Sequence, residues 1–272
     1  MSEIIYLNGD YINKENATIS IMDRGFLFGD GVYELIPVYN GKPFLIKKHL
    51  ARLKSSLTLI GMDPQNPYVE NLQSILLELI EKNKYVNYFF YVQITRGYQA
   101  SRNHVYNEEA DPTLLVMGEK CQVFPREKLS AGFKGCLQDD FRWTKSNIKS
   151  ISLLGNVMLK NYASRNGFYE TLLVRDEKLT EGSASNVFVS KDSHVMTPNL
   201  GSDLLPGVTR DLLIDLLNEN DIYVKECDIS KQDLIDSDEV WCTSSTNYCV
   251  PITEIDGKII GSGDVGKNSF KS

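Results

Sequence analysis

Residues 31–46 read GVYELIPVYNGKPFLI, two β-rich runs on either side of Asn40-Gly41. Asn-Gly between such runs is the strongest short-range signal for a β-hairpin, because both turn residues need a positive φ. The same dipeptide, Asn8-Gly9, separates residues 4–7 from residues 10–13. The first part of the chain is therefore predicted to contain hairpins of antiparallel strands.

Two helical patterns follow this hairpin. Their apolar residues recur three and four positions apart, as the buried face of a helix requires. The first set ends before Gly61 and the second begins after Pro67: Leu50, Leu53, Leu57 and Ile60, then Leu72, Ile75, Leu76 and Leu79. We expect two helices here, then a strand at 85–95, a polar loop at 97–111 and a strand at 113–118.

The second half of the chain mixes strands and helices without a βαβ rhythm. Alternation predicts a strand at 133–141, and a helix is expected from Ser152 to Gly167. A second helix is expected to open at Pro206 and to end near Glu219, because proline is tolerated at the first position of a helix. Further strands are expected at 168–174, 186–190, 194–197, 238–245 and 249–255. This arrangement indicates an α+β fold.

The chain of 272 residues is long enough for about two domains. The stretch EKCQVFPREKLS has no apolar period and contains Pro125. We interpret residues 119–128 as a linker between an N-terminal α+β domain, residues 1–118, and a C-terminal α+β domain, residues 129–272.

Composition excludes several classes of protein. Apolar residues make up 42% and charged residues 24% of the chain, which is typical of a globular protein. The net charge is −7, with no basic run, so nucleic acid and anionic membranes are not expected partners. No apolar stretch approaches the length of a spanning helix, and the N-terminus lacks a signal-peptide pattern. We expect a soluble, cytoplasmic protein.

Cysteines and histidines point to neither a disulfide framework nor a metal site. The five cysteines (121, 136, 227, 242 and 249) are odd in number and form no CxxC pair. The three histidines (49, 104 and 194) lie far apart and lack metal-ligand spacing. The sequence therefore predicts reduced thiols and no metal.

A series of motifs resembles class IV (fold-type IV) pyridoxal-phosphate aminotransferases. The motifs occur in the family's order along nearly the whole chain: DRGFLFGDGVYE (23–34), HLARL (49–53), ITRG (94–97), IKSISLLGNVMLK (148–160), LTEGSASNVF (179–188), LLPGVTRD (204–211) and CTSST (242–246). Within the class, the likeness is closest to the D-amino acid aminotransferases. The resemblance implies the fold-type IV architecture, pyridoxal 5'-phosphate as cofactor and a homodimer.

This resemblance identifies the two catalytic residues. Lys149 matches the family's Schiff-base lysine, which we expect to be partly buried among apolar neighbours. Glu181 matches the acid that pairs with the pyridine nitrogen, where its charge favours the protonated, electron-accepting ring. Ser183 and Asn186 follow on the same loop and match cofactor-binding positions. On the residues alone, Glu181 would be an exposed glutamate at a turn.

The resemblance also implies the phosphate site. Gly207, Val208 and Thr209 lie where a helix is expected to begin, so free N–H groups and the helix dipole would face an anion. Further contacts implied by the family are the hydroxyl of Ser245, its neighbour Ser244, the positive charge of Arg52 and the apolar platform of Leu205. On the residues alone, Arg52 would be a cation on a helix surface.

Substrate recognition is assigned by the resemblance to Tyr33, Arg102 and His104. In the D-amino acid branch, a tyrosine on the early strand and an Arg-x-His pair hold the substrate carboxylate, and the pair reaches into the neighbouring subunit. Arg102 lies one residue farther from Gly97 than in the family pattern. On the residues alone, Arg102 would be a solvated loop cation.

Three functions remain compatible with the family's motifs. Tyr33-Glu34 and the Arg102-x-His104 pair favour transamination of a D-amino acid, such as D-alanine, with a 2-oxo acid as amino acceptor. The near relative is 4-amino-4-deoxychorismate lyase, which releases 4-aminobenzoate and pyruvate on the same scaffold, and branched-chain transamination comes next. A non-catalytic protein with this fold is disfavoured, because both Lys149 and Glu181 are present.

Overall fold

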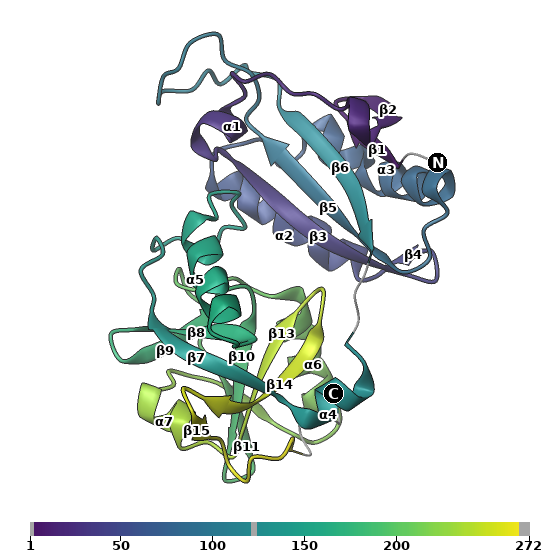
Figure 1. The fold of residues 1–272 in the computed structure, drawn as a ribbon. Helices are drawn as coiled ribbons and strands as arrows, with labels where there is room; N and C mark the ends of the chain where they lie inside the picture. The colour runs from purple at the N-terminus through teal and green to yellow at the C-terminus, as the bar shows by residue number, and fades with distance from the viewer. Residues whose placement is uncertain (1–2, 121–123, 267–272) are drawn as a thin grey trace. The chain divides into compact units, whose positions relative to one another are not determined.

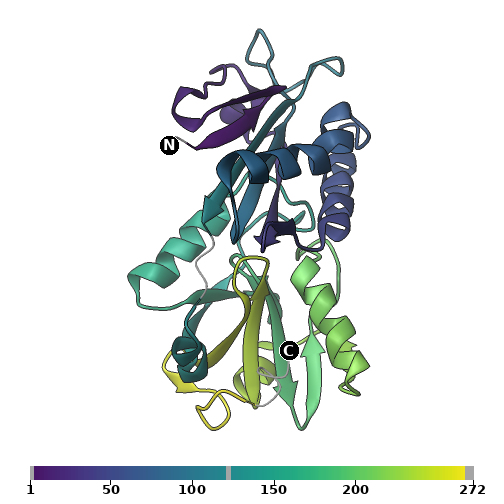
Figure 2. The same cartoon turned by 90° about the vertical axis from the view of Figure 1, so that its right-hand side faces the viewer.

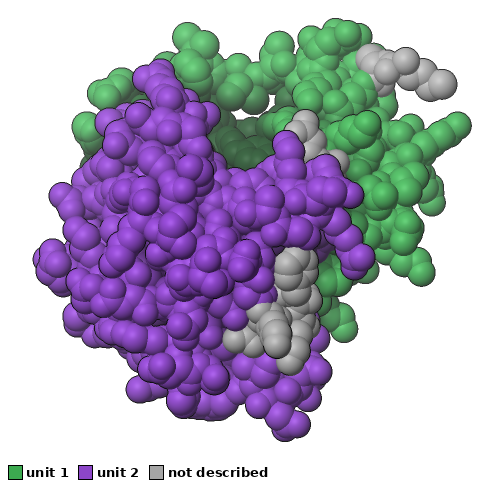
Figure 3. Space-filling model, turned by 60° about the horizontal axis from the view of Figure 1, so that its bottom comes forward, with its two compact units in different colours: residues 1–121, 148–153 green, residues 122–147, 154–272 purple. Residues whose placement is uncertain are grey.

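The computed structural model describes residues 3–120 and 124–266 of the chain. It divides into two compact units, coloured separately in Figure 3. Unit 1 comprises residues 1–121 and 148–153, and unit 2 comprises residues 122–147 and 154–272.

Unit 1 contains one antiparallel sheet covered by two helices. Its elements are β1 (Ile4–Leu7), β2 (Asp10–Asn13), the 3-10 helix η1 (Lys14–Asn16), α1 (Arg24–Phe28), β3 (Gly31–Tyr39), β4 (Lys42–Pro43), α2 (Ile46–Leu59), α3 (Pro67–Asn83), β5 (Tyr88–Thr95) and β6 (Thr113–Lys120). The strand order is β2-β1-β6-β5-β3-β4. Helices α2 and α3 lie together on one face of this sheet (Figures 1 and 2).

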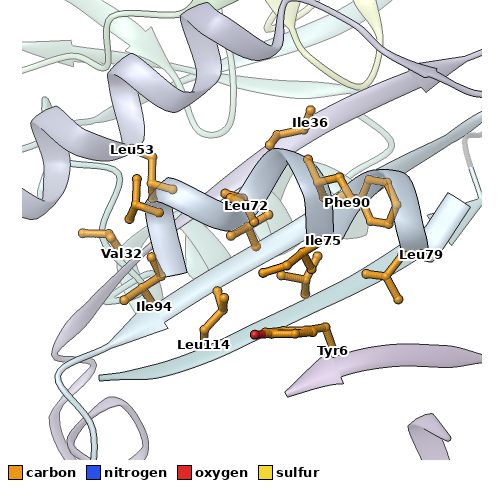
Figure 4. Packing of buried hydrophobic residues seen from close by; sticks show 14 of the residues in the cluster. Tyr6, Val32, Ile36, Leu53, Leu72, Ile75, Leu79, Phe90, Ile94 and Leu114 are labelled. Carbon is orange, nitrogen blue, oxygen red and sulfur yellow. The ribbon is translucent and has the colours of Figure 1, made fainter. Parts of the chain in front are cut away.

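The predicted hairpins and amphipathic helices are confirmed in unit 1. Asn40 and Gly41 both have positive φ, 50° and 72°, and join β3 to β4. The expected second strand at 42–46 is short, because Leu45 takes a left-handed conformation and α2 begins at the next residue. The apolar faces of both helices pack on the sheet, with Leu53, Leu72 and Leu79 opposite Ile36 and Phe90 (Figure 4).

Unit 2 contains one mixed sheet. Its elements are α4 (Arg126–Ala131), β7 (Phe133–Asp139), α5 (Leu154–Arg165), β8 (Glu170–Arg175), β9 (Lys178–Gly182), β10 (Asn186–Lys191), β11 (His194–Thr197), α6 (Val208–Glu219), β12 (Val224–Glu226), α7 (Lys231–Ile235), β13 (Glu239–Ser244), β14 (Tyr248–Ile255) and β15 (Lys258–Ile259). The order is β12-β11-β10-β13-β14-β7-β8-β9, with β15 paired to β14. The pairs β11/β12, β14/β7 and β7/β8 are parallel, and the remaining pairs are antiparallel.

The predicted domain bounds can be compared with the two units. The division between unit 1 and unit 2 falls within the segment 119–128, which we interpreted as a linker. The same segment contains the end of β6 and the beginning of α4, with Pro125 as the N-cap of that helix. Residues 121–123, including Cys121, lie outside the described part. The contacts of residues 148–153 group them with unit 1, although we expected Lys149 in the C-terminal domain. A β-bridge between Val32 and Ser150 accounts for this grouping.

Two further observations concern the described residues. None of their helices is long and apolar enough to cross a membrane. Cys136, Cys227 and Cys242, which fall within this part, are free thiols. The α+β interpretation of the sequence is confirmed by both units.

Candidate active site

Lys149 lies in a segment that pairs with the free edge of β3. The N–H of Tyr33 donates to the Lys149 carbonyl (2.9 Å), and the N–H of Ile151 donates to the Gly31 carbonyl (3.1 Å). The N–H of Lys149 donates to the Ser56 hydroxyl on α2 (3.1 Å). These hydrogen bonds hold the backbone of the predicted lysine against unit 1.

The side chain of Lys149 is half-buried. Its Nζ lies 4.2 Å from the centroid of the Tyr33 ring, a cation–π distance. Among the residues that the structure describes, no acceptor hydrogen-bonds to this amine and no carboxylate forms an ion pair with it. Unit 1 therefore presents an amine that is partly screened from water and not committed to a protein partner.

Tyr33 lies on the sheet face opposite to the helices. Ile36 faces the helices, so Tyr33, an odd number of residues away on the same strand, faces the other side. The Tyr33 ring lies 5.7 Å from that of Tyr91, whose hydroxyl donates to Gln93 (2.6 Å). Burial, together with the nearby Tyr33, raises the pKa of Tyr91 to about 12. Unit 1 thus brings the predicted residues Tyr33 and Lys149 into contact.

Arg52 is buried and binds Glu34, so it is not a solvated cation on the helix surface. The Nε and Nη2 of Arg52 donate to the two carboxylate oxygens of Glu34 at 2.9 and 2.5 Å. His49 Nδ1 lies 3.1 Å from the same carboxylate. Burial alone would raise the pKa of Glu34, but Arg52, His49 and the charge of Lys149 hold that pKa well below its usual range. This cluster fixes the orientation of the Arg52 guanidinium.

Arg102 and His104 lie on the exposed loop between β5 and β6. The Arg102 guanidinium carbon lies 5.0 Å from the centroid of the Phe28 ring, and the His104 ring lies 5.3 Å from it. Within the described residues of this chain, no hydrogen bond, ion pair or ring contact joins either side chain to Tyr33. One chain alone therefore does not assemble the predicted carboxylate-binding trio.

Glu181 is buried at the end of β9, which excludes the interpretation as an exposed turn residue. One carboxylate oxygen accepts from Arg142 Nη1 (2.7 Å). The other accepts from the Leu205 N–H (3.0 Å) and the Asn186 amide (3.4 Å). Burial raises the pKa of Glu181 to about 7, although Arg142 and the Leu205 N–H act in the opposite direction.

Arg142 divides its charge between two carboxylates. Its Nε and Nη2 both donate to Asp140 (2.9 Å each), which leaves only Nη1 for Glu181. Asp140 also accepts from the Thr180 hydroxyl (2.8 Å) and forms an ion pair with Arg175 (3.2 Å). These partners outweigh burial and hold the pKa of Asp140 below its ordinary value. The negative charge of Glu181 is consequently less fully balanced by its partners than that of Asp140.

The loop before α6 is fastened to the same acid. Asn186 donates to the carbonyl of Leu205 (2.8 Å), while the Leu205 N–H donates to Glu181. A Cβ at Gly207 would lie 1.9 Å from the Asn186 side-chain oxygen, so a larger residue is excluded there without rearrangement. Unit 2 thus brings four predicted residues together, namely Glu181, Asn186, Leu205 and Gly207.

Helix α6 begins at Val208, with Gly207 as its N-cap. The expectation that Pro206 opens the helix is wrong by two residues, because Gly207 has an extended conformation and Pro206 precedes it. No side chain caps the helix. The N–H groups of Val208 and Thr209 have no helical acceptor, and the positive end of the helix dipole lies there. This N-terminus is suited to bind an anion.

Hydroxyl groups of the CTSST motif lie at the end of β13. Thr243 is paired with Asn186 in the sheet, so their side chains share a face. The Thr243 hydroxyl is buried and, among the described residues, has no hydrogen-bond partner. The Ser244 hydroxyl accepts from the Asn247 N–H (3.2 Å) inside the following turn. Ser245 is half-buried in the same turn.

Ser183 uses its hydroxyl within unit 2. The hydroxyl donates to the buried carboxylate of Glu170, and the Ser183 N–H donates to the Thr171 carbonyl (2.9 Å). Its own carbonyl accepts from the Asn156 amide (2.8 Å). A cofactor contact by Ser183 stays a prediction, and its hydroxyl already has a partner.

The structure adds the ion pairs of Glu34 and Arg142, neither of which we predicted as a site residue. The alternation of VYELIPV contained a signal for Glu34, because it lies on the same strand face as Val32 and Ile36. Arg142 had no local signal, since its partner Glu181 lies 39 residues away in the sequence.

Comparison with known proteins identifies the family to which this chain is similar. The chain matches the amino-transferase class IV family over residues 31–255. It is 38% identical to the D-alanine aminotransferase of Bacillus licheniformis over 262 residues, which cover 96% of this chain and 92% of that protein.

Solved structures share the fold. The branched-chain amino acid aminotransferase of Escherichia coli has a TM-score of 0.90 at 23% identity, with 99% of this chain and 91% of that chain covered. A hypothetical aminotransferase from Mycobacterium tuberculosis, solved in a PLP-bound form, has a TM-score of 0.81 at 20% identity, with coverage of 94% and 92%.

Proposed function

Because this chain belongs to the class IV aminotransferase family, we propose that it moves the amino group of a D-amino acid, such as D-alanine, to a 2-oxo acid with pyridoxal 5'-phosphate as cofactor. The observation that carries the proposal is the 38% identity, over 96% of the chain, to the D-alanine aminotransferase of Bacillus licheniformis. The side chains of both units support it.

The residues present fit this cofactor. Lys149 supplies a half-buried amine without an acceptor among the described residues, as an aldehyde-binding lysine requires. Glu181 supplies a buried carboxylate that Arg142 only partly compensates, which suits a protonated ring nitrogen. The N–H groups of Val208 and Thr209, at an uncapped helix N-terminus, suit a phosphate.

Further residues complete the proposed cofactor site. Leu205 would present its side chain to the ring, because its backbone is held by Glu181 and Asn186. The remaining proposed contacts are Gly207, Ser183, Ser244, Ser245 and the guanidinium of Arg52. The unpartnered Thr243 hydroxyl adds a donor next to Asn186.

When bound, the cofactor supplies a ring that accepts the electrons released as the substrate Cα–H bond breaks. Lys149 would take the proton from that carbon and return it when the amino group is transferred to the 2-oxo acid. Glu181 would hold a proton on the ring nitrogen. The Tyr33 ring beside the Lys149 amine would limit the directions from which a substrate approaches it.

We propose that the active enzyme is a cytoplasmic homodimer. Arg102 and His104 are exposed and contact Phe28, not Tyr33, within one chain. They would therefore bind the substrate carboxylate in the site of the neighbouring subunit, together with that subunit's own tyrosine. A guanidinium suits this role, because it grips a carboxylate with two parallel hydrogen bonds.

The test is a product assay with the purified protein. Incubation with D-alanine and 2-oxoglutarate should yield pyruvate and D-glutamate, whereas L-alanine should yield neither. Lys149→Ala should abolish turnover, and Lys145→Ala, at an exposed position four residues earlier, should leave it unchanged. Release of 4-aminobenzoate from aminodeoxychorismate, without activity on D-alanine, would instead establish the lyase.

Borohydride reduction tests the lysine directly. Reduction of the protein with bound pyridoxal phosphate, followed by peptide mapping, should place a phosphopyridoxyl group on the peptide that contains Lys149. A label on another lysine would contradict the assignment.

A further inference from the structure

The loop that carries Arg102 and His104 is held in place by one buried arginine on α1. Arg24 is 4% exposed. Its Nη1 donates to the carbonyl of Asn103 (2.6 Å) and its Nη2 to the carbonyl of His104 (3.1 Å). These two carbonyls belong to consecutive residues of the loop that lies beside α1 in Figure 1.

The guanidinium of Arg24 is held in turn by the carboxylate of Asp30. Its Nε donates to Asp30 (2.8 Å), which also accepts from Arg96 Nε (2.9 Å). Both guanidinium groups hold the pKa of Asp30 below its ordinary value against the effect of burial. Arg96 Nη2 donates to the carbonyl of Ile60 (2.7 Å), which directly follows α2. This hydrogen bond connects the Arg24–Asp30–Arg96 ion-pair cluster to the helical layer of unit 1.

A second side chain organises the loop from within. The Gln99 amide donates to the carbonyls of Ser101 (3.3 Å) and Val105 (3.2 Å). The Gln99 oxygen accepts from Arg24 Nη1 (3.2 Å) and from the Asn107 N–H (3.4 Å). Arg24 and Gln99 thus bind the backbone of the loop on both sides of Arg102.

Phe28 joins the same helix to the two functional side chains. The guanidinium carbon of Arg24 lies 4.8 Å from the centroid of the Phe28 ring, and that of Arg102 lies 5.0 Å from it. The His104 ring lies 5.3 Å away. Phe28 is therefore a surface against which Arg102 and His104 rest, and it belongs to the helix that Arg24 begins.

We propose that Arg24 is a positioning residue for substrate recognition: it sets the backbone of the 99–107 loop so that Arg102 and His104 are held in the geometry that binds a substrate carboxylate. The inference rests on the proposed function for the role of Arg102, and it goes beyond that function by assigning Arg24, Gln99 and Phe28. A guanidinium is needed here, because one planar group donates to Asp30 and to two successive carbonyls in different directions.

The kinetic test compares Arg24→Gln with Arg102→Ala and with the double variant. We expect Arg24→Gln to raise KM for D-alanine at least tenfold, with kcat and the cofactor absorption spectrum within twofold of the wild type. In the Arg102→Ala background, Arg24→Gln should raise KM by a smaller factor than it does in the wild type, because only His104 is then left to be positioned. Arg24→Lys, which keeps the ion pair with Asp30, should lie between wild type and Arg24→Gln.

A second variant tests the same inference without removing a buried charge, in case Arg24→Gln does not fold. Gln99→Ala changes a half-buried loop residue and should raise KM several-fold with kcat unchanged. The inference is overturned if Gln99→Ala and Arg24→Gln both leave KM within twofold. It is also overturned if Arg24→Gln lowers kcat and raises KM equally with and without Arg102, which is the pattern of a merely structural residue.

Hydrogen exchange separates this inference from the proposed function. In Arg24→Gln, the Asn107 amide, which is bonded to Gln99, should exchange at least tenfold faster than in wild type, whereas the Leu72 amide in α3 should be unchanged. Faster loop exchange in a protein without activity on D-amino acids would leave the positioning role intact and refute the function. Unchanged exchange and KM in an active enzyme would refute the positioning role alone.

Discussion

Each unit contains a buried glutamate that is bound by an arginine, and the two acids differ in how far they are compensated. Glu34 receives two hydrogen bonds from Arg52 and a contact from His49, and its pKa is held well below the ordinary range. Glu181 receives one hydrogen bond from Arg142, which Asp140 already occupies, and burial raises its pKa to about 7.

The difference in pKa between Glu34 and Glu181 indicates that the two buried carboxylates have different roles. A buried ion pair with complete hydrogen bonding stays ionised and orients its partner, as Glu34 orients Arg52. A buried carboxylate with incomplete compensation gains from an additional cation or donor. This difference supports the proposal that Glu34 has a structural role and that Glu181 pairs with the ring nitrogen of the cofactor.

The largest expected effect is on stability in unit 1. Glu34→Gln should lower the free energy of unfolding by about 3–5 kcal/mol, because it leaves Arg52 buried without its counter-charge. Urea titration at pH 7.5 measures this. Glu70→Gln, which removes an exposed partner of Lys54 on α3, serves as the control and should change stability by less than about 0.5 kcal/mol. Equal effects of the two variants would contradict the comparison.

The second effect is the pH dependence of stability in unit 2. The pKa of Glu181 is raised on folding, so the folded protein binds this proton more tightly than the unfolded chain. The resulting stabilisation is fully present below the ordinary carboxyl pKa and is lost as pH rises to about 7. The free energy of unfolding of the cofactor-free wild type, relative to Glu181→Gln, should therefore fall by on the order of 3 kcal/mol between pH 4.5 and 8.

Urea titrations of both proteins across this range measure the difference. Glu177→Gln, at an exposed position four residues earlier in the same hairpin, is the matched control for the removal of a glutamate. A wild type that gains stability relative to Glu181→Gln as pH rises would reverse the sign and refute the proposed difference between the acids.

The third effect is on turnover. Glu181→Gln keeps the shape and removes the charge, so cofactor should still bind while transamination slows by at least 10²-fold, as for other lost electrostatic partners. Steady-state kinetics with D-alanine and 2-oxoglutarate measure it, and Glu177→Gln should retain wild-type turnover. Wild-type turnover in Glu181→Gln would mean that another group serves the ring nitrogen.

The smallest expected effect is on substrate binding, and it concerns Arg102, which interacts with neither of the two glutamates. Arg102→Ala should raise KM for D-alanine at least tenfold, which corresponds to about 1.4 kcal/mol of binding, with an unchanged cofactor spectrum. Kinetics and absorption spectra check this. An unchanged KM would remove Arg102 from substrate recognition.

Local patterns in the sequence were sufficient for much of the fold. The Asn40-Gly41 hairpin and the apolar faces at Leu53 and Leu72 follow from neighbouring residues, and the structure has them as expected. Helix α1 was missed because it spans five residues, Arg24–Phe28, and its N-cap Asp23 binds Thr95 far along the chain. The end of α6 at Glu219 was predicted correctly, but its start was wrong by two residues, since the sequence did not reveal the extended conformation of Gly207.

Less of the candidate site than of the fold could be predicted from local sequence patterns. Lys149 and Glu181 were found through family motifs, and nothing in the spacing of residues indicates that the Lys149 segment pairs with β3. Arg142 was missed because its role depends on Asp140 and Glu181 converging in the folded unit. Contacts of this kind are set by tertiary packing, which a periodicity of two or 3.6 residues does not encode.

The most direct test of the contrast between the two acids is a carboxyl NMR titration of the cofactor-free protein with ¹³C-labelled glutamate. Resonances of Glu34 and Glu181 are assigned by loss of signal in the two glutamine variants. We predict that Glu181 titrates with a midpoint near 7, that Glu34 stays ionised down to pH 4, and that pyridoxal phosphate shifts the Glu181 midpoint downward. A Glu181 that titrates at an ordinary value of about 4.3 and does not respond to pyridoxal phosphate would contradict the account.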